Sequence, residues 1–372
     1  QSPDDGEKFN LNNLETQFDV HETPKDNQVR KIIGDIPSDI YQPVFSDYLQ
    51  RLQRGKHLKK YSFQDKYLIA LDATQYHFSN TIHCSECLQK EKKNGVIEYS
   101  HQVLQPIICH PDQKQILPLM PEAIKNIDGT EKQDCEINAA KRLLPKIRER
   151  HPRMDFIWLA DSIYATDPFI KTVLANDEEF IFRAKQGDHK SLYKHIETAT
   201  YESHRTVSGN TEIAYRWYKE VPLNNSSKIT VTVLKAFVIT TDKKGNKKST
   251  IAGVWTTNIP AEKNNVAALT KAARARWHIE NQCFNALKNY GYELTHNWGH
   301  AKGESFSFYI LIMLAFYIHQ ILELTDQLFQ WCRKSCGTYK MLWEDLNALF
   351  RLIVFNSWEE MLTRCLFEKG DD

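Results

Sequence analysis

The sequence predicts an α/β fold in which one sheet is flanked by helices. Between residues 61 and 200, short apolar runs alternate with a stretch of helical period, a pattern typical of strands and helices packed in layers. The 372 residues are enough for one large domain with an insertion or for two domains. Apolar residues make up 41% of the chain and charged residues 26%, which is ordinary for a soluble globular protein.

Composition and periodicity divide the chain into five expected segments. The first 40 residues are polar and lack a clear period, so we predict a loose arm, followed by a helix at 43–54. The segments are an N-terminal arm and helix at 1–60, the first part of the sheet core at 61–200, a β-rich insertion at 201–260, the second part of the core at 261–330, and C-terminal helices at 331–372.

Two of the predicted core strands carry an acid at or near their carboxyl ends. Residues 66–72 and 155–161 are apolar runs that finish on Asp72 and Asp161. The other expected elements are strands at 99–110 and 115–120, a helix at 134–150, a helix at 169–175 and a strand at 179–185. Near the start of the helix at 134–150, Asp134 and Glu136 are expected to have capping and helix-dipole roles.

A third acid follows the insertion, in which residues 201–258 are rich in strand-forming residues and contain a turn at 243–246. Residues 271–292 have no Pro, and no Gly before Gly291, so we predict a helix that ends there. On this helix Arg276 and Glu280 share a face with Phe284 and Leu287. A carboxylate on an apolar stripe is costly to bury unless a cation contacts it. The simpler alternative is that Arg276 and Glu280 form an ion pair on an exposed face of the helix.

The apolar run at 306–322 is the membrane candidate in the sequence. It is near the lower length limit for a membrane span and contains Ser307, His319 and Gln320, so we interpret it as a buried core helix. Two amphipathic helices are expected after it, the last with a capping box formed by Ser357 and Glu360.

The amino terminus shows no secretory signal, and eight cysteines are scattered along the chain, which favours reduced thiols in the cytoplasm. Because residue 1 is Gln, we expect a processed chain or a fragment. The net charge of +1 does not indicate nucleic acid, so any DNA contact must come from local basic clusters. Such clusters occur at 51–60, 141–153, 243–248 and 271–276, and the alternative interpretation of each is a solvated surface.

Together, Asp72, Asp161 and Glu280 indicate a metal site. They are 89 and 119 residues apart, so only the fold can bring them together. Converging carboxylates repel one another unless a divalent cation neutralises them, and ligand sets made of oxygen suit Mg²⁺ or Mn²⁺. Such sites commonly hold two ions about 4 Å apart and act on phosphodiesters.

The segment Arg276-Trp-His-Ile-Glu280-Asn-Gln-Cys-Phe-Asn-Ala-Leu-Lys288, with Leu71-Asp72-Ala-Thr and Ala160-Asp161-Ser-Ile-Tyr164, resembles the DDE transposases of bacterial insertion sequences. The resemblance covers roughly residues 60–330. It implies an RNase H-like mixed sheet flanked by helices, a β-rich insertion subdomain before the last acid, and a Tyr-x2-Arg-x3-Glu-x6-Lys signature.

Residue by residue, the resemblance implies that Asp72, Asp161 and Glu280 are the catalytic metal ligands and that Arg276 is the signature arginine. Ala273 stands where the signature has Tyr, and its Lys is found one position later, at Lys288. Arg276 and Lys288 are therefore expected to contact DNA phosphates.

The implied activity is metal-dependent cleavage of double-stranded DNA at transposon ends, followed by transfer of the 3′-OH into target DNA. A homodimer would hold the two ends, in the bacterial cytoplasm at the nucleoid. The alternatives are a nuclease of the same fold without strand transfer and a DNA-binding relic without catalysis.

A separate group of soft ligands lies at His83-Cys84-Ser-Glu-Cys87, with His101, Cys109 and His110 downstream. This spacing is a loose zinc pattern, and a structural Zn²⁺ held by Cys84 and Cys87 with His83 is one expectation. The alternative is a set of ordinary reduced cysteines.

Overall fold

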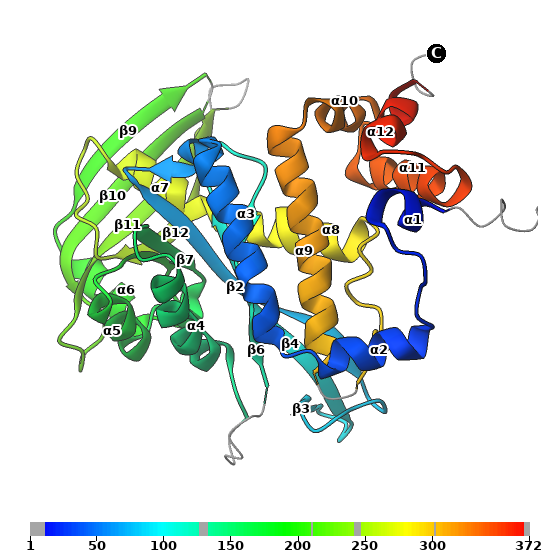
Figure 1. The fold of residues 1–372 in the computed structure, drawn as a ribbon. Coiled ribbons are helices and arrows are strands. Elements are labelled where there is room, and N and C mark those ends of the chain that lie inside the picture. The colour runs from blue at the N-terminus through cyan, green and yellow to red at the C-terminus, as the bar shows by residue number, and fades with distance from the viewer. Residues whose placement is uncertain (1–11, 126–132, 210, 242–246, 301–302, 368–372) are drawn as a thin grey trace, which may run out of the picture. The chain divides into compact units, whose positions relative to one another are not determined.

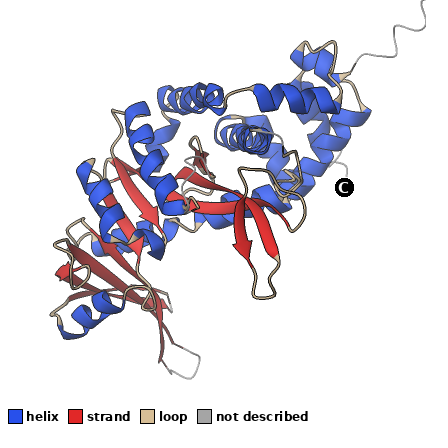
Figure 2. Cartoon of the chain, turned by 90° about the horizontal axis from the view of Figure 1, so that it is seen from below, coloured by secondary structure: helices blue, strands red, loops and turns tan. Residues whose placement is uncertain are grey.

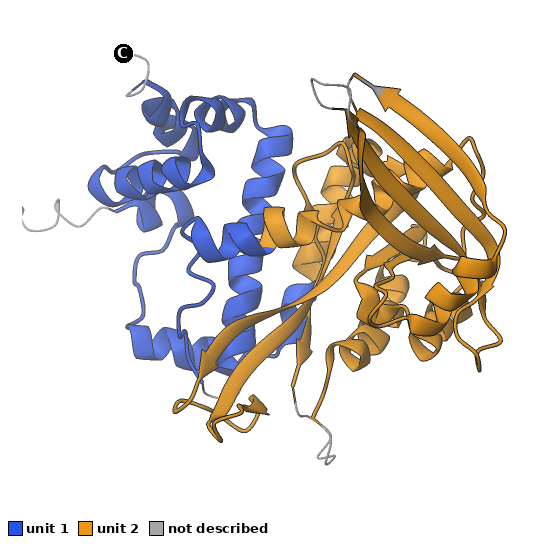
Figure 3. Ribbon diagram, turned by 180° about the vertical axis from the view of Figure 1, so that it is seen from behind, with its two compact units in different colours: residues 1–42, 284–372 blue, residues 43–283 orange. Residues whose placement is uncertain are grey.

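A computed structural model describes residues 12–125, 133–209, 211–241, 247–300 and 303–367 (Figure 1). The chain divides into two compact units, which Figure 3 colours separately. Unit 1 consists of residues 1–42 and 284–372, and unit 2 of residues 43–283. Figure 2 shows that strands and helices both contribute to the chain. The mixed α/β class that the sequence predicts is confirmed.

Unit 2 contains one mixed sheet of twelve strands among the described residues. The strands are β1 (Ser62–Phe63), β2 (Lys66–Ser79), β3 (Leu88–Glu91), β4 (Ile97–Cys109), β5 (Leu117–Pro118), β6 (Glu122–Ile124), β7 (Phe156–Ala160), β8 (Glu179–Arg183), β9 (Glu202–Ser208), β10 (Thr211–Pro222), β11 (Thr230–Thr241) and β12 (Lys247–Thr257). Their order is β3-β4-β2-β7-β8-β12-β11-β10-β9, with β1 beside β2, and β5 and β6 beside β4.

Only β2, β7 and β8 pair in parallel, and they form the centre of the sheet. All five residues of β7 are buried, as are residues 68–71 of β2. Continuous apolar runs of this kind are typical of parallel strands covered on both faces. This explains why the sequence predicted β7 almost to the residue.

The helices of unit 2 surround this sheet (Figure 1). They are α3 (Gln42–Arg54), α4 (Glu136–Arg150), α5 (Asp167–Ala175), α6 (Lys190–Thr198) and α7 (Val266–Ala275), with short 3-10 turns at η3 (His57–Tyr61) and η4 (Ser162–Tyr164). Helix α4 buries the side chains that its period of 3.6 places on one face, namely Ala139, Ala140, Leu143, Leu144 and Ile147. It packs against β4 and β6.

The β-rich insertion is present but continues the main sheet. Strands β9 to β12 form an antiparallel ladder, and β12 pairs with β8 from Trp255↔Arg183 to Thr257↔Ile181. The hydrogen bonds of β8 are therefore satisfied on both sides, by β7 and by β12. The turn predicted at 243–246, and with it most of the basic run at 243–248, lies outside the described residues.

The prediction of a loose N-terminal arm is wrong for its described part. Residues 12–41 contain α1 (Asn13–Phe18), α2 (Asp26–Asp35) and the turn η2 (Ser38–Tyr41), all in unit 1. The buried Asn13 side chain donates to the carbonyls of Phe350 and Ile353, both at 2.6 Å, and accepts from the N–H of Phe355 at 2.8 Å. A six-residue helix is not stable alone, so these distant contacts hold it and local sequence cannot predict it.

Unit 1 is helical in its carboxyl-terminal part. Its helices there are α8 (Asn285–Asn289), α9 (Glu304–Thr325), α10 (Gln327–Ser335), α11 (Tyr339–Leu352) and α12 (Trp358–Phe367). Three helices therefore follow the apolar α9, where two were predicted, because Asp326 ends α9 and caps α10 by accepting from the N–H of Phe329 at 2.8 Å. Half of the predicted capping box of α12 is confirmed, since Ser357 accepts from the N–H of Glu360 at 3.1 Å, whereas the Glu360 carboxylate accepts from the N–H of Asn356 at 2.8 Å.

Within the described residues, α9 is the one helix long and apolar enough to cross a membrane, judged by length and composition. In unit 1 it packs against α2 and α10. Ten of its residues, including Ser307 and Gln320, are buried. That arrangement is the one expected of a core helix.

Candidate active site

The first two predicted acids lie at the same edge of the parallel part of the sheet. Strands β2 and β7 pair from Tyr67↔Phe156 to Ala70↔Leu159, a constant offset of 89 residues. The same offset separates Asp72 from Asp161, so the register, continued by two positions, sets the two acids opposite each other. Residues at paired positions of parallel strands point to the same face.

The sequence analysis predicted that this strand ends at Asp72, and that prediction is wrong for β2. It continues to Ser79, because β4 pairs with it in antiparallel fashion from Leu68 to Ser79, with Gln105 opposite Asp72. What ends near Asp72 is the parallel partner β7, whose last residue precedes Asp161. Of the two parallel strands, only β7 therefore ends at the place where the acids meet.

The third acid, Glu280, lies where the helix changes its winding. The predicted continuous helix at 271–292 is instead α7, a π-helical segment η5 (Ile279–Phe284) and α8. Gly291, with φ of +92°, follows α8 as the sequence predicted for the stop. Single π-helical turns occur frequently at functional sites because they redirect side chains without ending the helix.

Arg276 links two of the acids. Its Nη1 lies 3.3 Å from Oδ2 of Asp72, and its Nη2 lies 2.6 Å from Oε1 of Glu280. Only 18% of the Arg276 side chain is exposed, so the pair is not the fully solvated surface contact of the simpler alternative. The remaining acid, Asp161, is bound by Lys185, whose Nζ lies 2.6 Å from its Oδ2.

The carboxyl group of Asp72 is in the least favourable electrostatic position of the site. Burial raises its pKa to about 7, and the charges of Glu136 and Glu280 add to the increase that Arg276 partly offsets. The pKa of Asp161 changes in the opposite direction. Burial acts to raise it, but hydrogen bonds from Lys185 and from the N–H of Ser162 lower it below its usual range. The free-energy cost of ionising the site therefore falls mainly on Asp72.

A fourth acid belongs to this site, and the sequence analysis gave it only a capping role. Glu136 is the first residue of α4, and its Oε1 accepts a hydrogen bond of 2.6 Å from the Tyr164 hydroxyl. Burial raises the pKa of Glu136, and the nearby charge of Asp161 raises it further. An acid in the first turn of a helix is usually explained by the helix dipole, so its contact with Tyr164 is a signal that only the fold provides.

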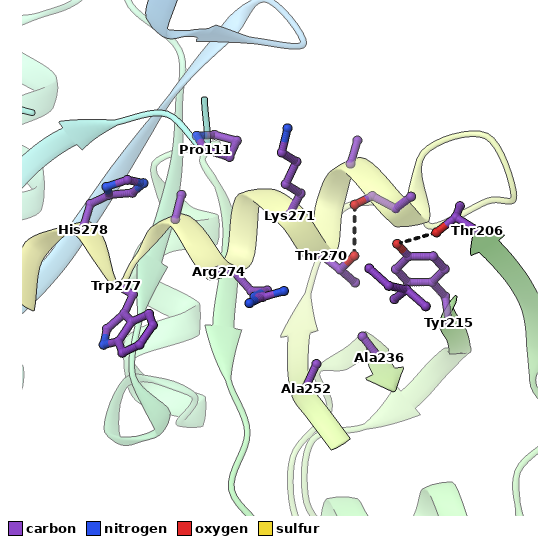
Figure 4. A pocket seen from close by; sticks show the side chains of 14 residues that line it. Pro111, Thr206, Tyr215, Ala236, Ala252, Thr270, Lys271, Arg274, Trp277 and His278 are labelled. Atoms are coloured by element: carbon purple, nitrogen blue, oxygen red, sulfur yellow. Dashed lines mark hydrogen bonds between the residues drawn. The ribbon is translucent and has the colours of Figure 1, made fainter. Parts of the chain in front are cut away.

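Beside the acids lies a pocket of about 430 Å³ whose lining includes Asp161, Glu280, Arg276 and Lys185. A second pocket of about 580 Å³ shares Ala252, Arg274 and Trp277 with the first. Figure 4 shows the second pocket, with Arg274 and Trp277 on one side of the helix and Lys271 and His278 near Pro111 on the other. We call these two adjoining pockets the acidic-site groove. Its acidic end is lined by the carboxylates of Asp161 and Glu280, and the groove also carries the exposed cations of Lys271 and Arg274 and the exposed indole of Trp277.

Lys288, the last predicted site residue, lies on α8 in unit 1, with an exposed side chain. Its expected contact with DNA phosphate remains a prediction.

The cysteine pair predicted as a zinc site is joined by His101 of β4. The two Sγ atoms of Cys84 and Cys87 are 3.8 Å apart, and Nε2 of His101 is 3.4 Å from each. Bond lengths of about 2.3 Å to sulfur and about 2.0 Å to nitrogen around tetrahedral Zn²⁺ require about 3.8 Å and about 3.5 Å. These side chains can therefore bind one metal ion.

His83, which was expected to be the histidine ligand, does not belong to this cluster. Its ring stacks on Tyr99 at a centroid distance of 4.1 Å, and its Nδ1 lies 3.2 Å from the carbonyl of Thr81. The antiparallel pairing of β3 with β4 brings His101 to the cysteines instead, since Leu88, next to Cys87, is opposite Ser100. Sequence proximity favoured the wrong histidine.

A scan against models of known protein families finds no match to this chain, and no curated protein matches it. The function is therefore argued from the residues of the site.

Proposed function

We propose that the chain is a DDE-type DNA transposase whose metal ligands are Asp72, Asp161 and Glu280. The observation that carries the proposal is the shared offset of 89 residues, which sets Asp72 opposite Asp161 beside a helix that carries Glu280. Arg276, which contacts both Asp72 and Glu280, brings the third acid to the same site and supports the proposal.

The chemistry of the donors supports Mg²⁺ or Mn²⁺. All four acids, Glu136 included, offer oxygen ligands, which these ions prefer. The pKa of Asp72, raised to about 7, means that its ionisation is costly until a cation arrives. Bound divalent ions supply activation of an attacking oxygen and stabilisation of a leaving oxygen.

The residues around the acids have separate roles. Arg276 holds Asp72 and Glu280 in place, and Lys185 holds Asp161. A water oxygen would attack a phosphorus atom at the element end, leaving a 3′-OH, and that hydroxyl would then attack a target phosphorus with loss of the target 3′ oxygen. Both steps use one set of carboxylates, because both are displacements at phosphorus.

The acidic-site groove fits a nucleic-acid strand. The side chains of Lys271 and Arg274 are exposed, and the indole of Trp277 is 60% exposed. Cations bind the phosphate backbone, and an exposed aromatic ring stacks on an unpaired base. Because the net charge of the chain is only +1, binding should depend on such local cations.

The test is an in vitro reaction of the full chain with linear DNA that carries the sequences flanking its coding region. We expect Mg²⁺-dependent nicks at the element ends and joined products with a target plasmid. Glu280→Gln should abolish both products while DNA binding persists. The matched control is Glu262→Gln, an exposed glutamate shortly before α7, which should leave both products intact. Cleavage without joined product would instead identify a nuclease, and binding without cleavage would identify a relic.

We also propose that the cluster of Cys84, Cys87 and His101 binds Zn²⁺, because its distances match tetrahedral coordination by sulfur and nitrogen. Cys84→Ser should remove about one zinc per chain, measured by elemental analysis of protein purified without chelators. The buried Cys109 of β4 is the control, and Cys109→Ser should leave zinc content unchanged. Equal zinc in both variants would refute this assignment.

A further inference from the structure

The three cysteines of unit 1 all meet in the core of its last three helices. Cys332 lies on α10, Cys336 is the residue that caps the carboxyl end of the same helix four positions later, and Cys365 lies on α12. They are 0%, 1% and 2% exposed, within a core that includes Phe329, Leu342 and Met361. Helices α10, α11 and α12 pack against one another around this core.

A carboxylate from the third helix reaches the same point. The Cys336 thiol lies 3.5 Å from Oδ2 of Asp345 on α11. One donor atom each from Cys336, Asp345 and Cys365 lies within 4.8 Å of the others, which is close enough to surround a single ion. The Cys332 thiol is hydrogen-bonded to Cys365, and its Sγ lies 3.2 Å from the carbonyl of Leu362.

We propose that Cys336, Asp345 and Cys365 bind one Zn²⁺ that joins the end of α10 to α11 and α12. Around tetrahedral Zn²⁺, sulfur and oxygen ligands are about 3.5 Å apart, which is the observed Cys336–Asp345 distance. Thiolate sulfur with a single carboxylate selects Zn²⁺ over Mg²⁺. On binding, each thiol loses its proton to solvent and its sulfur forms a bond to the metal.

The ligand set points to a structural role for this ion. The Cys336 and Cys365 thiols are only 1% and 2% exposed, so substrate cannot reach the ion, and a site closed to substrate is the structural kind. The helices that the ion would join are short, at nine, fourteen and ten residues. A bound metal adds folding free energy that so small an apolar core cannot supply alone. The site is separate from the acids of unit 2 and does not depend on their proposed function.

The experiment compares zinc content in the full chain, purified under reducing conditions without chelators. Cys365→Ser and Asp345→Asn should each lose about one zinc per chain relative to the unaltered protein. The matched control is Glu344→Gln, at the exposed position next to Asp345, which should keep all zinc. The Cys84 cluster is tested separately, since Cys84→Ser should leave the zinc of unit 1 in place.

A spectroscopic measurement covers the case in which a variant fails to fold. In the Cys84→Ser chain, X-ray absorption at the zinc edge should show sulfur neighbours at about 2.3 Å and one oxygen at about 2.0 Å. Adding a chelator should then increase amide hydrogen exchange in α10–α12 and leave exchange in β7 unchanged. The proposal is overturned if both variants keep their zinc, if the zinc has no sulfur neighbour, or if a Cys332–Cys365 disulfide is isolated in place of metal.

Discussion

Replacing Asp72 with Asn should stabilise the metal-free chain at pH 8 and abolish its stabilisation by Mg²⁺. The Asp72 side chain is 22% exposed, and burial is the main reason that its pKa rises from 3.8 to about 7. At about 1.4 kcal/mol per pH unit, this increase corresponds to about 4 kcal/mol against the ionised form. The pKa of about 7 already includes the attraction of Arg276, so this cost is a net value. Because the amide removes the charge, a gain of about 4 kcal/mol is expected at pH 8.

The same reasoning predicts how the free energy of unfolding depends on pH. Between about pH 4 and pH 7 the folded protein holds a proton on Asp72 that the unfolded chain has released. Stability from this group is therefore present at low pH and lost as pH rises through that range. The difference in unfolding free energy between Asp72→Asn and the unaltered chain should accordingly grow from pH 4 to pH 7.

The assay is urea unfolding in EDTA, followed by tryptophan fluorescence, because Trp158 and Trp217 are buried in unit 2. Asp161→Asn is the matched control in the same site. Hydrogen bonds from Lys185 and the Ser162 N–H outweigh burial and lower the pKa of Asp161, so its amide should destabilise the chain at pH 8. Added Mg²⁺ should raise stability in the unaltered chain, by about 2.7 kcal/mol at a hundredfold excess over Kd, and in neither variant.

An Asp72→Asn chain less stable than the unaltered protein at pH 8 in EDTA would refute the reasoning. So would equal stabilisation of the variant and the unaltered chain by Mg²⁺. The first result would mean that the cations around Asp72 outweigh its burial. The second result would mean that Mg²⁺ does not bind this carboxylate.

Three further predictions concern other side chains. Arg276→Ala leaves two acids without their shared cation, so we expect metal-free stability to fall by about 2 kcal/mol in the same urea assay. Arg274→Ala and Lys288→Ala should each make the dependence of log K on log salt shallower by about one unit, measured by fluorescence anisotropy with DNA duplexes. An unchanged slope would rule out a phosphate contact for that residue. Tyr164→Phe removes the donor to Glu136, so the stability at pH 8 should fall by about 1–3 kcal/mol, and equal stability would show that the hydrogen bond contributes nothing.

The sequence was most informative where burial alone determined the local structure. The strand before Asp161 is apolar at every position, so its limits follow from composition. Strand β2 ran past its predicted end because β4, a distant segment, pairs with it there. Helix α1 depends in the same way on Asn13 and its partners more than 300 residues away. Long-range pairing of this kind leaves no local period in the sequence.

The site shows the same division between local and distant information. Spacing and residue type indicated the three acids, but Asp161 follows β7 and Glu280 lies in a π-helical segment, where the sequence predicted a strand end and a continuous helix. The sequence analysis gave Glu136 only a capping role and preferred His83 to His101 as the zinc ligand. Both were misjudged because each contact is made with another element, Tyr164 for Glu136 and the cysteine turn for His101. The thiol cluster of α10–α12 went unnoticed because its members are spread over about thirty residues without a recognised spacing.

The pairing of β12 with β8 has a consequence for how the chain could be shortened. Residues 181–183 would become a bare strand edge if β9 to β12 were deleted, with unpaired N–H and C=O groups beside Phe180 and Phe182. Exposed edges of this type recruit strands from other molecules, which leads to aggregation. The four added strands move the open edge from β8 to β9, whose side chains are mostly polar. Truncations aimed at a minimal form of unit 2 should therefore retain β12 or put a charged residue on β8.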